Sequence, residues 1–364
     1  MKKNIAILAL LCLILGGFFV SKLLLPDADF SETERRKLKP MPELSADTLK
    51  NGSFMQEFES YALDRFPLRD TFRGLKSAVQ LGVFLQADNN ELYLVNGSIA
   101  KQEYPLNSES LSYAATVFNS LYQTYLADTD TRVYFSVVPD KSAFLAPVSG
   151  NLQLDYPAFY AAVQNALPPE MTFADIADLL CADDYYRTDP HWKQEALVPV
   201  AERLLSAMGA EISADFSAQT LDSPFNGVYA GQLALPMRAD SITVLQHPDF
   251  DGCTVFDWEH NREIPVYDLS RAEGLDPYET YLSGALPLIT VENPGCTNGR
   301  ELVIFRDSYG SALAPLLIPS YSKITLVDIR YLSSRLLGNY LEFTDQDVLF
   351  LYSTSVLNHS ETLK

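Results

Sequence analysis

The sequence predicts an α/β protein built on a mostly parallel β-sheet. Short apolar runs rich in β-branched and aromatic residues alternate with stretches whose apolar residues recur at helical spacing. Such alternation is typical of parallel strands joined by helices. The 364-residue chain is 47% hydrophobic and contains 20 Tyr and 20 Phe, which is enough apolar material for a substantial core. This composition excludes a chain that is disordered throughout.

The first predicted elements lie in the first half of the chain. Leu92–Val95 is strand-like and ends in an Asn-Gly turn. Ser108–Ala127 is predicted to be a helix, because its apolar residues follow helical spacing. Arg132–Val138 is predicted to be a strand, since it is rich in Val, Tyr and Phe and stops at a proline. Pro157–Leu167 has a helical pattern, and Thr172–Leu180 fits either a short strand or a helix.

The second half completes the alternation. Lys193–Met208 is predicted to be a helix that Pro199 kinks. Residues 210–300 are rich in turns and short β segments, and we interpret them as an insertion. A buried strand at Leu302–Phe305 runs directly into a small-residue helix at Ser311–Leu317. Two further apolar runs supply the last strands, Ile324–Val327 and Val348–Tyr352.

An apolar leader precedes the part that is predicted to fold. Lys2 and Lys3 are followed by an uncharged run, Ile5–Val20, which is the layout of an export signal. The run is short for a membrane span, but the aliphatic stem of Lys22 lengthens the apolar stretch. No small-x-small cleavage site follows. Residues 1–25 are therefore predicted to be an uncleaved signal anchor, with a cleaved signal peptide as the alternative.

The sequence leaves the orientation of this leader open. By the positive-inside rule, the two lysines before the apolar run are outnumbered by the basic residues after it, which favours a cytoplasmic body. The short segment before the run and its signal-like layout favour export.

The rest of the chain is predicted to have two parts. Residues 26–95 are predicted to form a stalk and a helical N-terminal region, and residues 96–364 to form the α/β domain.

Charge and cysteine spacing exclude two kinds of site. The chain has 47 acidic and 27 basic residues, a formal net charge of −20, which disfavours binding to a nucleic-acid backbone. Cys12 lies in the leader, and Cys181, Cys253 and Cys296 lack metal-type spacing, so no metal site is predicted. A Cys253–Cys296 disulfide suits an exported protein, and three unpaired thiols are an equal alternative.

A serine follows the predicted central strand directly. Ser308 lies in the turn Arg306-Asp307-Ser308-Tyr309-Gly310, at the carboxyl end of that strand and the start of the next helix. Open α/β sheets bind ligands at this edge, and N–H groups at a helix start stabilise negative charge on a reacting oxygen. Ser308 is therefore a candidate nucleophile. Helix capping, a common role of serine, is the structural alternative.

An acid and an imidazole lie two residues apart in Thr188-Asp189-Pro190-His191-Trp192. In an extended chain such residues point the same way, and Pro190 favours an extended Asp189. A nucleophilic serine needs a base, and the base needs a partner that fixes its tautomer. The other three histidines, His247, His260 and His359, lack comparable neighbours. His191 as a helix-entry residue with Asp189 as a cap is the structural alternative.

Together these segments resemble a known family. Thr188–Trp192, Ile304–Tyr309 and Val327–Tyr331 resemble the DHHW family, which is similar to the SGNH-hydrolase-like proteins of alginate acetylation, the AlgX and AlgJ group. Further matches lie at Ser31–Arg36, Asp64–Arg69 and Val138–Lys141. The resemblance runs in order along the chain. It implies an SGNH-hydrolase-like fold, and it favours export, because such proteins are typically exported and tethered.

The resemblance also implies roles for residues. Ser308 would be the nucleophile, His191 the general base and Asp189 the acid that orients it. The chain departs from the family where Pro190 replaces a histidine. It departs again at Tyr281–Ala285, where many relatives carry Gly-Gly-Asn. Ala285 lacks a side-chain donor, so Ser283 and the Gly284 N–H are the oxyanion candidates that remain.

Five further residues are candidates for substrate binding. Arg330 is predicted either to bind an acidic sugar or an oxyanion or to form a salt bridge with a neighbouring carboxylate. Tyr331 and Lys141 are predicted to line the cleft. Trp192 and Tyr309 are predicted either to stack on sugar rings or to pack in the core.

The sequence thus predicts an exported, membrane-tethered serine acyltransferase or esterase that needs no cofactor. Its implied reaction is O-acetylation or deacetylation of a cell-surface polysaccharide, with a membrane protein that supplies acetyl groups as the implied partner. The alternative is a catalytically weak or inactive polysaccharide-binding or assembly protein with the same fold, which the Ala285 departure favours. A cytosolic serine hydrolase is disfavoured by the leader.

Overall fold

The computed structural model describes residues 2–24, 28–213 and 215–364. The chain forms an N-terminal unit, Met1–Asn90 with Val228–Pro236, and a C-terminal unit, Glu91–Gly227 with Met237–Lys364. The predicted end of the leader at Leu25 and the predicted start of the stalk at Pro26 lie outside the described residues.

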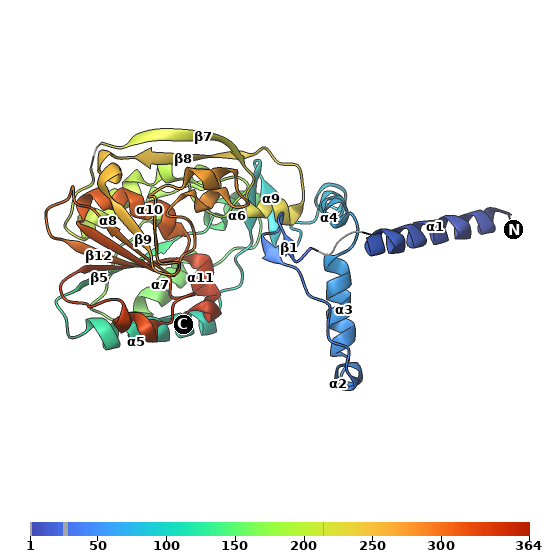
Figure 1. Cartoon of the computed structure of the whole chain (residues 1–364), viewed down its shortest axis with the longest axis horizontal. Coiled ribbons are helices and arrows are strands. Elements are labelled where there is room, and N and C mark those ends of the chain that lie inside the picture. The colour runs from blue at the N-terminus through green and yellow to red at the C-terminus, as the bar shows by residue number, and fades with distance from the viewer. Residues whose placement is uncertain (1, 25–27, 214) are drawn as a thin grey trace. The chain divides into compact units, whose positions relative to one another are not determined.

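The described residues of the N-terminal unit form helices and one two-stranded antiparallel ribbon (Figure 1). Ser45 starts α2 with a reciprocal capping pair to Thr48. Among the described residues, we find no helix that combines the length and the apolarity needed to cross a bilayer. The elements are α1 (Lys2–Leu24), β1 (Phe30–Ser31), β2 (Arg36–Lys37), α2 (Ala46–Lys50), α3 (Ser53–Asp64), α4 (Arg69–Ala78), a π-helical turn (Val79–Val83) and α9 (Val228–Leu233).

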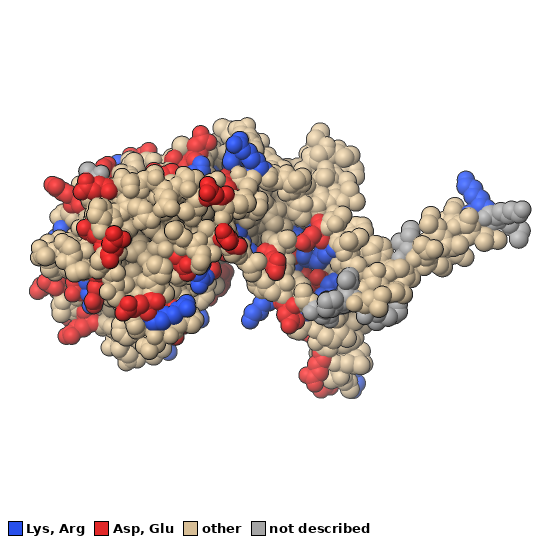
Figure 2. All heavy atoms as spheres, turned by 45° about the horizontal axis from the view of Figure 1, so that its top comes forward, with Lys and Arg blue, Asp and Glu red and all other residues tan. Residues whose placement is uncertain are grey.

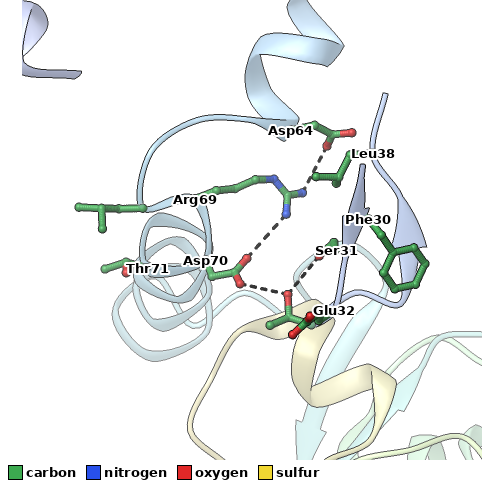
Figure 3. Close-up of a pocket in the computed structure, with 10 residues that line it drawn as sticks. Phe30, Ser31, Glu32, Leu38, Asp64, Arg69, Asp70 and Thr71 are labelled. Atoms are coloured by element: carbon green, nitrogen blue, oxygen red, sulfur yellow. Dashed lines mark hydrogen bonds and ion pairs between the residues drawn. The ribbon is translucent and has the colours of Figure 1, made fainter. Parts of the chain in front are cut away.

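Ion pairs tie the ribbon to α3 and α4. Arg36 donates to both carboxylate oxygens of Asp64, at 2.9 and 2.5 Å, and this pairing lowers the pKa of Asp64 to about 2. Arg69 forms ion pairs with Asp64 and Glu34. A cavity of about 410 Å³ lies beside these pairs, and its lining side chains are drawn in Figure 3.

The C-terminal unit is organised around an eight-stranded sheet of order β10-β9-β11-β13-β12-β14-β5-β6. The five strands from β13 to β6 are parallel, and β11, β9 and β10 extend the sheet with antiparallel pairings. The sheet strands are β5 (Arg132–Val138), β6 (Thr172–Phe173), β9 (Thr254–Asp257), β10 (Arg262–Ile264), β11 (Leu288–Glu292), β12 (Glu301–Arg306), β13 (Lys323–Val327) and β14 (Asp347–Ser353).

Helices cover both faces of this sheet (Figure 1). One face packs against α8 (Val198–Ala207) and α10 (Tyr309–Leu317), and the other against α5 (Ser108–Leu121), α7 (Tyr156–Ala166) and α11 (Thr354–Asn358). The mixed α/β class and the mostly parallel sheet are therefore confirmed. The unit also contains α6 (Ser142–Ser149) and two antiparallel hairpins, β3 (Leu92–Val95) with β4 (Ser98–Lys101) and β7 (Ser217–Phe225) with β8 (Asp240–Gln246).

Some predicted elements differ in detail from those observed. The stretch Lys193–Met208 is divided into a 3₁₀ turn and α8, and Pro199 occupies the first turn of α8, where its missing N–H costs no hydrogen bond. Part of the expected insertion, β9 to β11, belongs to the main sheet. Of the two alternatives for the cysteines, the structure has the unpaired thiols and not a Cys253–Cys296 disulfide, because all four cysteines are free.

Acidic side chains outnumber basic ones in the chain. In the view of Figure 2, Asp and Glu side chains are scattered over the C-terminal unit, with fewer Lys and Arg between them. This distribution agrees with the formal net charge of −20. A polyanion therefore meets general repulsion, and any binding of one depends on local contacts.

Candidate active site

Ser308 lies between the end of β12 and the first residue of α10. It occupies the N-cap position, yet its side chain makes no capping hydrogen bond. Instead its Oγ lies 2.7 Å from Nε2 of His191. The neighbouring Asp307 does the local work of a cap: its carboxylate accepts from the Tyr309 N–H at 3.0 Å and from the Ser353 N–H at 2.7 Å. The side chain of Ser308 therefore does not cap the helix, which was the structural alternative to a role as nucleophile.

His191 lies between the serine and an acid. Its Nδ1 is 2.6 Å from Oδ1 of Asp189, and the same oxygen accepts the His191 backbone N–H at 3.2 Å. A carboxylate only accepts hydrogen bonds, so it places the ring proton on Nδ1. Nε2 is then unprotonated and accepts the Ser308 hydroxyl proton. The three side chains predicted from sequence are thus brought together in one hydrogen-bonded chain.

Two aromatic rings hold the imidazole in place. The ring of Tyr278 stacks on His191 with centroids 3.9 Å apart and an interplanar angle of 12°. The ring of Tyr309 lies 4.9 Å from the imidazole, and its hydroxyl donates to the Pro190 carbonyl at 2.9 Å. Tyr278 belongs to a 3₁₀ turn in the turn-rich region, and no sequence pattern distinguishes it from the other tyrosines.

The loop that carries the acid and the base is a tight turn. Tyr185 and Trp192 form an antiparallel bridge, and the Tyr186 N–H donates to the His191 carbonyl at 3.0 Å. Thr188 accepts the Gly227 N–H at its side-chain oxygen, at 2.9 Å. Gly227 packs so closely that an added Cβ would lie 2.3 Å from the Thr188 carbonyl oxygen and 2.4 Å from the Asp189 Cβ. A side chain at position 227 is therefore incompatible with this loop.

Lys141 does not line a cleft. Its side chain is buried and its ammonium donates to the Tyr186 and Asp189 carbonyls at 2.8 and 2.9 Å. Burial lowers the pKa of Lys141 to about 7. Burial also raises the pKa of its neighbour Asp140 to about 7. The sequence prediction of a cleft role for Lys141 is corrected to contact with the backbone of the loop.

The two predicted stacking residues are packed inside the protein. Trp192 is fully buried and its indole N–H donates to the Tyr309 carbonyl at 3.1 Å. Tyr309 is 6% exposed. The core-packing alternative therefore describes both rings, and together they join the Asp189–His191 loop to the start of α10.

The candidates for an oxyanion site are only partly available. Leu282, Ser283 and Gly284 all have positive φ, at 50°, 55° and 89°, so the chain turns tightly here. The Gly284 N–H already donates to the Tyr281 carbonyl at 3.1 Å, and the buried Ser283 side chain lies in the same turn. The prediction that the Gly284 N–H stabilises an oxyanion is therefore corrected.

The first backbone N–H groups of α10 also have acceptors within the protein already. The N–H groups of Tyr309 and Gly310 donate to the side chain and the carbonyl of Asp307, at 3.0 and 3.2 Å.

Arg330 forms a two-point ion pair with Asp328, at 2.9 and 2.6 Å, which is the salt bridge that the sequence offered as the alternative to substrate binding. Tyr331 is 57% exposed. Among the residues that the structure describes, no group of three or more His, Cys, Asp or Glu side chains is arranged for a metal ion.

Comparison with solved structures identifies the fold. A DHHW family protein from Eubacterium siraeum matches with a TM-score of 0.61 and 19% identity over 76% of this chain and 95% of that chain. The fold resembles that of a DHHW family protein. The resemblance predicted from sequence is thus confirmed at the level of the fold. No family model matches the sequence, and no curated protein matches it.

Two structures of Bacillus cereus PatB1 have the same fold. One, solved with a sulfonyl adduct, has a TM-score of 0.59 and 16% identity over 73% of this chain and 95% of that chain. The other has a TM-score of 0.58 and 17% identity over 74% and 97%. The O-acetyltransferase domain of Pseudomonas putida AlgJ is a weaker match, with a TM-score of 0.43 and 13% identity over 74% and 93%.

Proposed function

We propose that this protein is a serine acyltransferase or esterase that transfers or removes O-acetyl groups on a cell-surface polysaccharide. The hydrogen-bonded chain Ser308–His191–Asp189 is the observation that carries the proposal. It has the composition and the order of contacts that nucleophilic acyl transfer requires. No metal or organic cofactor takes part in the proposed reaction.

The first half of the reaction forms an acetyl-enzyme. Ser308 Oγ attacks the carbonyl carbon of an acetyl ester, and its proton passes to Nε2 of His191. Asp189 stabilises the resulting imidazolium through Nδ1–H. The tetrahedral intermediate then collapses, the bond to the leaving oxygen breaks, and His191 returns the proton to that oxygen. The acetyl group remains on Ser308 as an ester.

The second half discharges the acetyl group. His191 takes a proton from a sugar hydroxyl or from water, and the oxygen attacks the acetyl carbonyl on Ser308. Collapse of the second tetrahedral intermediate breaks the bond to Ser308 Oγ, which recovers its proton from His191. A sugar acceptor gives O-acetyl transfer, whereas water gives net hydrolysis.

We further propose that the C-terminal unit lies outside the cytoplasm, tethered by the leader. The basic start and the uncharged run Ile5–Val20 support export. Acetyl groups for transfer would then come from a membrane protein that carries them across the bilayer. If the leader is cleaved, the protein is secreted instead.

One alternative function has support in the structure. Ala285 supplies no side-chain donor, and the N–H groups of Gly284, Tyr309 and Gly310 all donate to protein oxygens. Loss of one oxyanion donor lowers turnover by about a hundred- to a thousand-fold. These observations favour weak catalysis, and so they support the alternative of a catalytically weak or inactive polysaccharide-binding or assembly protein with the same fold.

The full-length protein, purified in detergent, tests the enzyme against this alternative. Wild type is expected to release p-nitrophenol from p-nitrophenyl acetate, and Ser308→Ala to abolish the release. Ser213→Ala is the matched control: its Oγ lies 2.7 Å from Nε2 of His247, but Nδ1 of that ring accepts the Asp249 N–H, so Nε2 carries the proton and cannot act as a base. Equal rates in wild type and Ser308→Ala would refute the enzymatic proposal.

A further inference from the structure

A buried lysine contacts the backbone of the loop that carries Asp189. Lys141 follows β5, at the same edge of the sheet as Ser308, and is 3% exposed. Its Nζ donates to the carbonyls of Tyr186, Arg187 and Asp189, at 2.8, 3.3 and 2.9 Å. An ammonium has three N–H donors, so these three acceptors match its capacity. One of these acceptors is the backbone carbonyl of Asp189.

A buried carboxylate holds the same loop from another element. Asp240, the first residue of β8, is 5% exposed. One of its oxygens accepts from the N–H and the hydroxyl of Thr188, at 2.9 and 2.7 Å. The other accepts from the N–H of Arg187 at 3.1 Å. The loop therefore gives its carbonyls to an ammonium and its N–H groups to a carboxylate.

We propose that Lys141 and Asp240 are positioning residues that together hold Asp189 where its carboxylate meets His191. The inference rests on the proposed function, because it assigns both residues to the acylation of Ser308. Neither residue is placed at the reacting atoms. Each acts through the backbone on either side of Asp189, and a displacement of about 1 Å in such a group lowers a rate by about a hundred-fold.

The charge of Lys141 determines how many carbonyls of the Asp189 loop its side chain can hold by hydrogen bonds. A neutral amine has two N–H donors and a lone pair, so one of the three carbonyls would face that lone pair. The charged groups around Lys141 are the carboxylates of Asp189 and Asp240, which favour its protonated form, and Lys193, which opposes it. The adjacent Asp140 faces Tyr156 and the Ser142 N–H instead.

The direction of the pH effect follows from the lowered pKa of Lys141, about 7. Below this pH the ammonium is charged and holds all three carbonyls; as the pH rises through about 7 the proton is lost and the loop loosens. The rate of Ser308 acylation is therefore expected to decrease as the pH rises above about 7. Removing the negative charge of Asp240 lowers the pKa of Lys141 further, which moves this alkaline limb to lower pH.

The test measures the rate of Ser308 acetylation by p-nitrophenyl acetate across pH in full-length protein. Lys141→Met is expected to slow acetylation about a hundred-fold and to remove the alkaline limb. Asp240→Asn is expected to retain the limb and shift it to lower pH. Lys323→Met, at the opposite end of the sheet, removes a lysine paired with Glu301 and is the matched control, with an unchanged rate and profile.

Amide hydrogen exchange of residues 184–192 provides a second readout that needs no activity. Lys141→Met removes the three hydrogen bonds from Nζ to this loop. Since the loss of a single hydrogen bond to a charged group speeds exchange by about tenfold, exchange of the loop is expected to rise by at least that factor, with no change in β12. If Lys141→Met does not fold, the Asp240→Asn profile decides alone. An unshifted alkaline limb in Asp240→Asn, or a wild-type profile in folded Lys141→Met, overturns the inference.

The two proposals can fail separately. Wild type that is never acetylated on Ser308 refutes the proposed function. In that case faster exchange of the loop in Lys141→Met still supports the positioning of Asp189 by Lys141, whereas unchanged exchange overturns it.

Discussion

Replacing Asp189 by Asn changes the proton on His191 while keeping the shape of the site. Asp189 Oδ1 lies 2.6 Å from Nδ1 of His191 and fixes the ring proton there. An Asn amide group that donates to Nδ1 instead places the ring proton on Nε2, which then cannot accept the Ser308 proton. In a Ser-His-Asp site such a change lowers kcat about ten-thousand-fold. This corresponds to about 5.4 kcal/mol of transition-state stabilisation, at about 1.36 kcal/mol per factor of ten.

The assay is kcat/KM for p-nitrophenyl acetate at a pH below 7, where Lys141 is charged. Asp257→Asn is the matched control, because the buried Asp257 holds Nδ1 of an exposed histidine, His260, in the same way at 2.8 Å but far from Ser308 in the sequence. Asp257→Asn is expected to retain wild-type activity. If Asp189→Asn keeps activity within tenfold of wild type, the assignment of Asp189 as the orienting acid is refuted.

Two further predictions concern packing and charge. Gly227→Ala is expected to lower both the Tm and the rate of Ser308 acetylation, because its Cβ would lie 2.4 Å from the Asp189 Cβ; a variant with a wild-type Tm and rate would contradict the described loop. Asp64→Asn is expected to destabilise the N-terminal unit at neutral pH and to have little effect near pH 2, because the depressed pKa of Asp64 adds stability above about 4 that is lost as the pH falls through about 2. Thermal unfolding at several pH values measures this difference, and a constant difference across pH would contradict it.

Much of the fold was predictable because its signals are local. The strand runs and the Asn96-Gly97 hairpin depend on residues that lie next to one another in the chain. The same holds for Ser308, since a strand end followed by a helix start is readable from sequence. Asp189 and His191 could also be predicted from the sequence, because the acid and the base lie two residues apart in one loop.

The rest of the site depends on contacts between distant parts of the chain. Tyr278 stacks on His191 from a turn with no distinguishing pattern. Asp240 meets the loop from the start of β8, 52 residues from Thr188. Lys141 was assigned to a cleft because it follows the predicted strand Arg132–Val138, and only the three carbonyls that surround it explain its burial. Local periodicity contains no information about such partners.

The proposed mechanism requires Ser308 to act as a nucleophile that His191 activates. The most direct measurement is mass spectrometry of the full-length protein quenched rapidly after mixing with p-nitrophenyl acetate. One acetyl group is expected on the peptide that contains Ser308, absent in Ser308→Ala and strongly reduced in His191→Ala. A wild-type protein without acetyl on Ser308 would exclude this serine as the nucleophile, and labelling that is unchanged in His191→Ala would exclude His191 as its base.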